Sequence, residues 1–249
     1  MEKRDIMGGL AKGLRVIEAF NADHPRLTIT EAADRTGLDR ATARRCLLTL
    51  ADLGYADYDG KFFTLTPHVL RLGTACLATM PLPELVQPWL DRLSGLLGES
   101  TSVSILDRGD IVYVARAAQR KVMSIALMPG SRLPAFCTSM GRVLLAALPE
   151  AEARTLLGPM TARTPMTLTD PATVMQCIAD ARSDGYALID QEVELGLRSI
   201  AVPLFDARGR TVAAMNLGLP ATQASVQDLA HRYLDAMRLI QGEIRKVLT

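Results

Sequence analysis

Residues 28–55 read TITEAADRTGLDRATARRCLLTLADLGY, and they decide how the first part of the chain folds. A short helix signal is followed by Gly37 and Leu38, and a longer helix signal begins at Asp39. Two helices joined by a tight, glycine-containing turn are typical of a helix-turn-helix. The second helix carries four polar or basic side chains in its first two turns: Arg40, Thr42, Arg44 and Arg45. Such side chains can reach phosphates and guanine edges in a DNA major groove, so the stretch predicts a DNA-binding element.

The ends of these helices are marked by capping residues. Thr28, followed three residues later by Glu31, matches a capping box for the first helix of the pair. Asp39 is a preferred residue for the N-terminal cap of the second. Apolar residues also recur at helical spacing over residues 9–22, which predicts a further helix before the pair.

A hairpin is expected after the second helix. Residues 55–58 and 61–65 are rich in strand-forming residues, and the Asp59-Gly60 dipeptide between them favours the type I′ turn of a tight hairpin. The aromatic residues of this hairpin are expected to pack rather than to wedge between bases. Three helices followed by a hairpin predict a winged helix-turn-helix with Lys61 near the tip of the wing.

Charge placement, rather than an excess of charge, must carry any DNA contact. The whole chain has a net charge of +1, and its first 66 residues hold as many Lys and Arg as Asp and Glu. Two other interpretations stay open: an ordinary solvated helix face, or a winged helix that contacts a protein. The expected DNA-binding residues are Thr28, Arg40, Thr42, Arg44, Arg45 and Lys61.

The remainder of the chain predicts a second domain. Residues 67–79 form an apolar helix signal, and a cluster of prolines that begins at Pro81 suggests a boundary near residue 80. The expected division is a winged helix-turn-helix domain over 1–66, a linker helix over 67–80 and a second domain over 81–249. Strands are expected at 100–106, 111–115, 122–127, 187–189, 199–205 and 211–219. Helices are expected at 84–98, 138–148, 150–157, 172–184 and 225–247. This pattern is α+β with an antiparallel sheet.

Several separated motifs resemble the IclR family of bacterial transcription regulators. In the first domain these are GLRVIEAF, LTITEAADRTGL, DRATARRCLLTLADLGY and FTLTPHVLRLG. In the second they are GSRLPAFCTSMGRVLLAAL, DGYALIDQEVELGLRSIAVPLFD and AAMNLGLP. The GSRLPAFCTSMGRVLLA motif is most similar to the subgroup that controls aromatic-acid catabolism through the β-ketoadipate pathway. The resemblance implies a GAF-like effector-binding domain, a homodimer and often a homotetramer, with operator DNA and a small organic acid as partners.

An acid-binding site is expected beside the helix that begins near Thr138. Free N–H groups and the positive end of a helix dipole favour a carboxylate there, and Thr138, Ser139 and Arg132 lie in the loop and first turn. Arg142 is a second nearby cation. The family resemblance adds four expected effector-binding residues: Asp190, Ser199, Asn216 and Gly218. Some relatives have Cys in place of Ser199 and Ser in place of Asn216 and Gly218, and this departure favours an aromatic acid over a small keto acid. A purely structural interpretation stays open for three of these residues: Thr138 as a helix cap, Asp190 as a turn or salt-bridge residue, and Gly218 as a close-packing residue.

Enzymatic chemistry is not expected. The sequence lacks a glycine-rich phosphate loop, HExxH and GxSxG, and no histidine lies in the motifs of the second domain to activate Cys137. The four cysteines are widely spread without a CxxC, so neither a metal site nor a cofactor is expected. The N-terminus has no apolar signal-peptide core, and no run of residues is apolar enough to cross a membrane. These observations predict a cytoplasmic protein.

Overall fold

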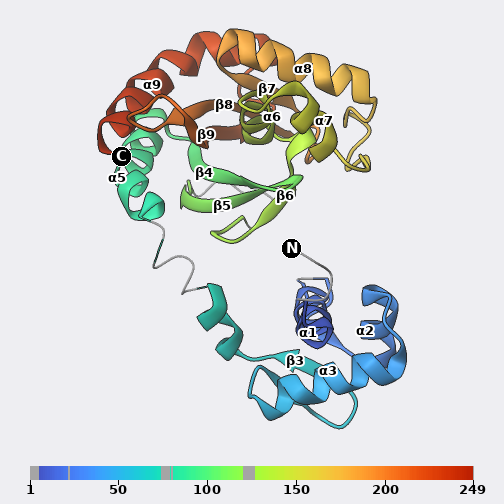
Figure 1. The fold of residues 1–249 in the computed structure, drawn as a ribbon. Coiled ribbons are helices and arrows are strands. Elements are labelled where there is room, and N and C mark those ends of the chain that lie inside the picture. Colours follow the sequence, from blue (N-terminus) through green and yellow to red (C-terminus); the bar gives the residue numbers. More distant parts are fainter. Residues whose placement is uncertain (1–5, 22, 74–78, 80, 120–126, 249) are drawn as a thin grey trace. The chain divides into compact units, whose positions relative to one another are not determined.

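The computed structural model describes residues 6–21, 23–73, 79, 81–119 and 127–248 (Figure 1). The chain divides into two compact units, Met1–Thr79 and Met80–Thr249. The expected linker helix begins with a 3₁₀ turn, Pro67–Val69, and helical residues continue to 73. Most of its remainder, and the strand expected at 122–127 except for its last residue, lie outside the described residues.

The first unit is a winged helix-turn-helix, as predicted. Its elements are α1 (Gly8–Glu18), β1 (Arg26–Leu27), α2 (Ile29–Thr36), α3 (Arg40–Asp52), β2 (Ala56–Tyr58) and β3 (Phe63–Leu65). The hairpin strands β2 and β3 are joined by β1 in a three-stranded antiparallel sheet of order β1-β3-β2. The sequence pattern did not predict β1, which is only two residues long.

The predicted caps explain why the helices begin where they do. The backbone N–H of Thr28 donates to Glu31 Oε2 at 2.7 Å, and the N–H of Glu31 donates to Thr28 Oγ1 at 3.3 Å, which completes a capping box. Gly37 ends α2 at φ 66°, a left-handed conformation that favours glycine. Asp39 accepts the N–H of Thr42 at 2.8 Å and so starts α3.

The second unit is built on one six-stranded antiparallel sheet. Its strands are β4 (Ser100–Asp107), β5 (Asp110–Ala117), β6 (Arg132–Pro134), β7 (Ala187–Asp190), β8 (Leu197–Phe205) and β9 (Thr211–Pro220), in the order β6-β5-β4-β9-β8-β7. Its helices are α5 (Leu82–Leu97), α6 (Ser139–Ala146), α7 (Glu150–Leu156), α8 (Pro171–Asp184) and α9 (Val226–Val247), with a 3₁₀ turn η3 (Ala135–Cys137) before α6. The short edge strand β6 was not predicted.

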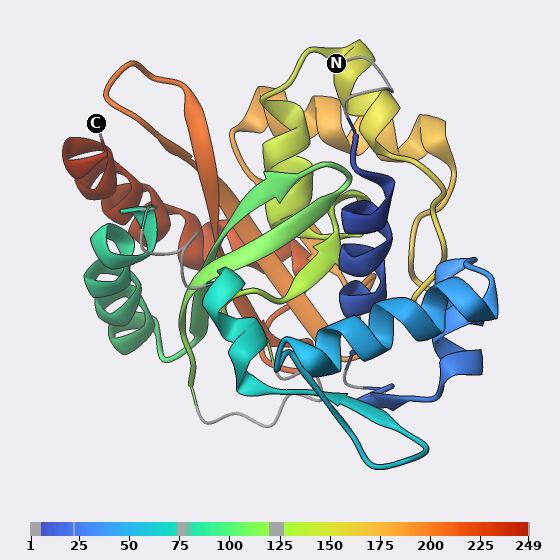
Figure 2. The ribbon, with the colours of Figure 1, turned by 60° about the horizontal axis from the view of Figure 1, so that its bottom comes forward.

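Helices cover both faces of this sheet (Figure 2). Alternate strand residues such as Val202 and Met215 pack with α5 and α9 in one core. Their neighbours Ala201 and Ala214 pack with α6 and α8 in the other. Strand residues of β4, β8 and β9 that face α6 are therefore enclosed between the sheet and a helix. Within the part of the chain that is described, no helix is both long and apolar enough to cross a membrane.

Candidate DNA-binding face and ligand pocket

The recognition helix α3 presents its arginines to solvent on two strips. Ala43, Leu47 and Leu50 hold its inner side in the core. Arg40 and Arg44 are exposed and lie about one turn apart on one flank, because residues four apart share a face. Arg45 is also exposed, but it borders a groove between α3 and α1 together with Thr42. Among the described residues, no carboxylate forms an ion pair with any of the three guanidinium groups.

Unlike the arginines of α3, the side chain of Thr28 is already hydrogen-bonded within the described part of the protein. Its hydroxyl donates to Glu31 Oε2 at 2.8 Å while it accepts the N–H of Glu31. The hydroxyl hydrogen is therefore used in the cap of α2. Thr28 can accept a further hydrogen bond but cannot donate one, and a phosphate oxygen needs a donor. A DNA contact by its side chain would have to break the capping box.

The wing carries a second cation beside the predicted one. Lys61 Nζ lies 4.9 Å from the ring centre of Phe62, and the guanidinium carbon of Arg26 lies 4.4 Å from the same ring centre. Strand β1 brings Arg26 there because it pairs with β3. Sequence reasoning missed Arg26, since a strand of two residues gives no periodic signal. The other wing aromatics pack: Tyr58 stacks on Phe63, which is fully buried.

In the second unit, a row of small polar residues crosses the sheet on the face toward α6. Gly218 of β9 is paired with Ser100 of β4 on one side and with Ser199 of β8 on the other. Asn216, two residues earlier in β9, faces the same way and is paired with Ser102. Alternation thus places these five polar or small residues on the face of the sheet toward α6.

A pocket lies between this row and the N-terminus of α6. It is lined by Ser100, Tyr113, Arg116, Leu127, Leu133, Thr138, Ser139, Met140, Val193, Leu197, Ser199, Asn216 and Gly218. Thr138 caps α6 by accepting the N–H of Gly141 at 3.1 Å, and Ser139 Oγ lies 2.8 Å from Ser199 Oγ. Five of the seven expected effector-binding residues therefore come together here: Thr138, Ser139, Ser199, Asn216 and Gly218.

The cation of this pocket is Arg116, which sequence reasoning missed. Its Nη1 donates to Ser102 Oγ at 3.0 Å, and no carboxylate among the described residues pairs with it. Partial burial lowers the pKa of its guanidinium. Tyr113 lines the same pocket, and burial raises the pKa of its phenol to about 12, so the hydroxyl stays protonated at neutral pH.

A bulge in β5 explains how Tyr113 and Arg116 share one face. Val103 pairs with Ala115, but the next residue, Ser104, pairs with Tyr113, so Val114 is an extra residue in the ladder. In a regular strand, residues three apart point to opposite faces. The inserted residue cancels this alternation and aims both side chains into the pocket.

The two remaining expected residues, Arg132 and Asp190, do not line this pocket. Arg132 is on the edge strand β6, where its guanidinium pairs with Asp107 at 2.7 Å and with Asp110 at 3.3 Å. Asp190 pairs with Arg198 at 2.6 Å, and this hydrogen bond lowers the pKa of the Asp190 carboxyl. Both charges are already matched within the protein, which leaves Arg116 as the cation that faces the pocket among the residues the structure describes.

The pocket is narrow. Its volume is about 30 Å³, which is room for only about one or two water molecules. Sites for drug-sized molecules commonly measure about 300–1,000 Å³. A ring-sized ligand could enter only if side chains or wall segments moved apart, so what holds these walls together controls what can bind.

Cys137 has the environment of a structural thiol. It is buried before α6, and its Sγ donates to the carbonyl of Pro134 at 3.7 Å. Burial, followed by the nearby Glu192 carboxylate, raises the pKa of the thiol to about 11. A nucleophilic cysteine requires a lowered pKa, so this geometry disfavours thiol catalysis.

Comparison with known families identifies both units. Residues 9–60 match the IclR helix-turn-helix domain, and residues 74–244 match the C-terminal domain of the bacterial transcriptional regulator IclR. The chain belongs to the IclR family. The winged helix of this IclR protein is therefore its DNA-binding domain, and the family resemblance seen in the motifs is confirmed.

Individual relatives narrow the subgroup. The Pca regulon regulatory protein of Pseudomonas putida is 46% identical over 92% of this chain and 80% of its own length. The p-hydroxybenzoate hydroxylase transcriptional activator of Acinetobacter baylyi is 38% identical over 98% of this chain and 93% of its own. Among solved structures, the inducer-binding domain of a PobR double mutant from Acinetobacter, in complex with 3-hydroxybenzoic acid, matches with a TM-score of 0.63. It is 31% identical and covers 67% of this chain and 98% of its own. This IclR protein thus resembles regulators of aromatic catabolism.

Proposed function

We propose that this regulator senses a small aromatic acid in the pocket between β4, β5, β8, β9 and α6, and that it acts on operator DNA in the cytoplasm. The observation that carries the proposal is Arg116, a half-buried cation that faces the pocket with a serine hydroxyl as its partner and no carboxylate from the described part of the chain. A guanidinium group offers two parallel N–H donors that match a carboxylate. An acid bound there would supply the missing negative charge.

The rest of the lining supports an aromatic body on this acid. Leu127, Leu133, Val193 and Leu197 give the pocket apolar walls, while Tyr113 offers a neutral hydroxyl. The 38% identical relative carries p-hydroxybenzoate in its name, and the related PobR domain was solved with 3-hydroxybenzoic acid. A ring with a carboxylate at one end satisfies both the cation and the apolar walls.

A thermal-shift screen tests this function. The panel contains protocatechuate, 4-hydroxybenzoate, β-ketoadipate, cis,cis-muconate, pyruvate and glyoxylate. A ligand at one hundred times its Kd stabilises the folded state by ~2.7 kcal/mol, which raises Tm by several degrees. We expect the largest shift with an aromatic acid, loss of that shift in Arg116→Met, and its retention in Arg132→Met, because Arg132 pairs outside the pocket. A flat panel, or equal shifts in Arg116→Met and the unmodified protein, would refute the proposal.

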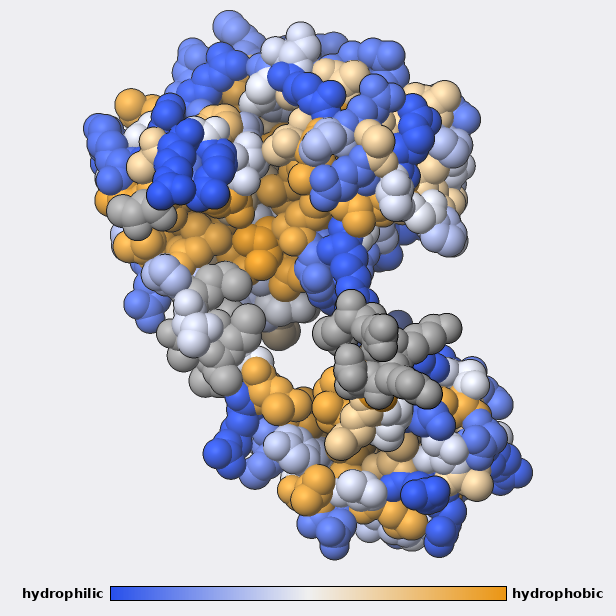
Figure 3. Space-filling view, viewed as in Figure 1, coloured by the Kyte–Doolittle hydropathy of each residue, from blue (hydrophilic) through white to orange (hydrophobic). Residues whose placement is uncertain are grey.

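We further propose that the protein is a homodimer, with a dimer of dimers as the larger form. The groove between α1 and α3 supports this, because it exposes Leu10, Leu14, Leu53 and Leu72 at the surface of the first unit, and Figure 3 shows apolar side chains there. Two recognition helices on two half-sites would bind DNA more tightly than one. The acid can change operator binding only through a different affinity for two arrangements of the chain. Sedimentation equilibrium of the unmodified protein checks the oligomeric state, and a monomer at micromolar concentration would contradict it.

A further inference from the structure

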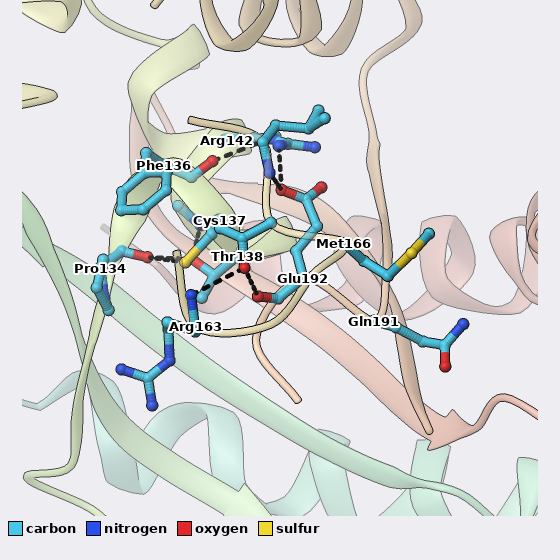
Figure 4. Close-up of polar contacts among 12 residues, drawn as sticks. Pro134, Phe136, Cys137, Thr138, Arg142, Arg163, Met166, Gln191 and Glu192 are labelled. Carbon is cyan, nitrogen blue, oxygen red and sulfur yellow. Dashed lines mark hydrogen bonds and ion pairs between the residues drawn. The ribbon is translucent and has the colours of Figure 1, made fainter. Parts of the chain in front are cut away.

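Arg142 and Glu192 form a buried ion pair (Figure 4). Arg142 Nη2 lies 2.8 Å from Glu192 Oε2, and the two side chains are only 4% and 6% exposed. Arg142 Nε also donates to the carbonyl of Phe136 at 3.1 Å, and the N–H of Leu168 donates to Glu192 Oε2 at 3.2 Å. The two charges are thus held by four segments of chain: η3, α6, the loop before α8, and the loop after β7.

Stability alone does not explain this pair. Removing two charges from water is costly, and apolar residues of similar volume often replace a buried ion pair without loss of stability. Desolvation is the largest influence on Glu192 and raises the pKa of its carboxyl even with Arg142 beside it. Because burying the charges of Arg142 and Glu192 costs free energy, the pair is better explained by the segments of chain that it holds together.

The segments that the pair joins are two walls of the pocket. Arg142 lies in α6, whose start supplies the pocket residues Ser139 and Met140. Glu192 precedes Val193, which lines the pocket from the loop between β7 and β8. The distance between α6 and this loop is therefore set where Arg142 meets Glu192.

That loop, residues 191–196, is closed by the N–H of Gln191, which donates to the carbonyl of Leu197 at 2.9 Å, and by the N–H of Gly196, which donates to Gln191 Oε1 at 3.0 Å, and it is also held from outside. Gln191 has φ 61°, a left-handed conformation that residues other than glycine rarely adopt. Glu194 Oε2 is buried without a hydrogen-bond partner. Two threonines brace the loop from the segment before α8: Thr164 donates to the carbonyl of Gln191 at 2.7 Å, and Thr167 donates to the carbonyl of Glu192 at 2.6 Å. The ion pair is the side-chain bond that ties the loop to α6.

We propose that Arg142 and Glu192 form a positioning pair that sets the width of the ligand pocket and thereby the size of acid that the regulator accepts. This inference rests on the proposed acid-sensing function. The narrow volume of the pocket makes the separation of its walls the limiting dimension. A wall fastened by a short ion pair moves little, so the room that a single ring needs comes from the other side chains of the lining, and larger acids are excluded. Without the fastening, the loop relaxes and larger rings enter.

The test replaces the pair by apolar residues of similar size. In Arg142→Met/Glu192→Leu no charge is left unpaired, but the carbonyl of Phe136 and the N–H of Leu168 each lose a partner, so the second unit is expected to fold with a Tm close to that of the unmodified protein. Isothermal calorimetry gives the Kd of benzoate, 4-hydroxybenzoate and 2-naphthoate. We expect the ratio of the naphthoate Kd to the benzoate Kd to fall at least tenfold. The matched control, Glu150→Leu/Arg154→Met, removes an exposed pair on α7 and keeps the ratio of the unmodified protein.

A second readout separates this inference from the proposed function. Hydrogen exchange of the ligand-free protein is measured over residues 191–196, and the double variant is expected to exchange at least tenfold faster there. An unchanged Kd ratio together with unchanged exchange overturns the positioning role. An unmodified protein that binds none of the three acids refutes the proposed function, and the exchange rate alone then decides whether the pair fastens the loop. If the double variant does not fold, Arg142→Lys keeps the charge but loses the bond to Phe136, and at least a threefold fall in the Kd ratio is expected; no fall overturns the role.

Discussion

The hydroxyl oxygens of Ser139 and Ser199 lie 2.8 Å apart, and both residues are buried between α6 and the sheet. Each hydroxyl has one hydrogen to donate, and one of the two is used within the pair. The other hydrogen is free to meet an oxygen of a bound acid. This contact therefore joins the helix to the sheet and offers the ligand one donor.

Replacing Ser199 with Ala should weaken acid binding. The variant loses the bond to Ser139 and one hydroxyl of the pocket, and a neutral hydrogen bond contributes about 1 kcal/mol. We expect the Kd of the preferred acid to rise about fivefold in isothermal calorimetry. Ser94→Ala is the control, because Ser94 is also buried but its hydroxyl donates to the carbonyl of Glu99, and neither residue lines the pocket. Equal affinities of Ser199→Ala and the unmodified protein would show that this hydroxyl pair does not meet the ligand.

The sequence predicts those parts of the molecule that depend on neighbours in the chain. The caps at Thr28 and Asp39 are local, so their positions agree with the structure. The two-residue turn expected at Asp59-Gly60 is wrong: Tyr58 pairs with Phe63, the N–H of Asp59 donates to the carbonyl of Phe62, and β3 begins at Phe63 rather than at residue 61. The family resemblance predicted Ser199, Asn216 and Gly218 as effector-binding residues, and in the structure all three line one pocket. The sequence pattern could not predict which distant segments of the chain pair with one another.

Arg116 and Arg132 show this limit most clearly. The bulge at Val114 turns Arg116 into the pocket, and a bulge depends on the register between two strands rather than on either sequence alone. Arg132 is close to the expected site in sequence, but the turn between β4 and β5 places Asp107 and Asp110 beside it. The positions of carboxylates decide which cation remains for a ligand, and those positions come from the fold.

Alkaline pH should destabilise the protein partly through Tyr113. Burial raises the pKa of its phenol from 10.0 to about 12, so the unfolded chain loses this proton first. The contribution to stability is complete below pH 10 and is lost as pH rises toward 12, by at most about 1.4 kcal/mol per pH unit. Urea unfolding at pH 8, 10 and 11.5 should show that Tyr113→Phe loses less stability than the unmodified protein. The difference between the two at pH 8 serves as the baseline, and parallel curves above pH 10 would contradict a buried phenol.

Cys137 should resist alkylation in the folded protein. With the pKa of its thiol raised to about 11, on the order of one thiol in a thousand is ionised at pH 8, and the thiolate is the reactive form. Mass spectrometry after iodoacetamide treatment at pH 8 is expected to find Cys137 unmodified in the native protein and modified in guanidinium chloride. Rapid native labelling of Cys137 would reopen the possibility of thiol chemistry.

The arginines of α3 should separate into base readers and phosphate contacts. We expect Arg44→Ala to reduce discrimination between operator and random DNA by about 1–3 kcal/mol, because Arg44 lies within α3 on the strip shared with Arg40. We expect Arg40→Ala and Arg45→Ala to weaken both DNAs alike and to lower the salt slope by about 1 for each phosphate that is no longer neutralised. Fluorescence anisotropy from 50 to 200 mM salt measures both quantities.

Arg208→Ala, on the exposed turn between β8 and β9, is the matched control and should leave both quantities unchanged. If Arg45→Ala, rather than Arg44→Ala, reduces the discrimination between operator and random DNA, the side of α3 that borders the groove with α1 faces the bases. If all three variants of α3 keep the slope and the discrimination of the unmodified protein, the exposed arginines do not touch DNA. The wing cations Lys61 and Arg26 would then be the next candidates for the phosphate contacts of this DNA-binding domain, because the balanced charge of the first 66 residues leaves the attraction of DNA to the placement of individual cations.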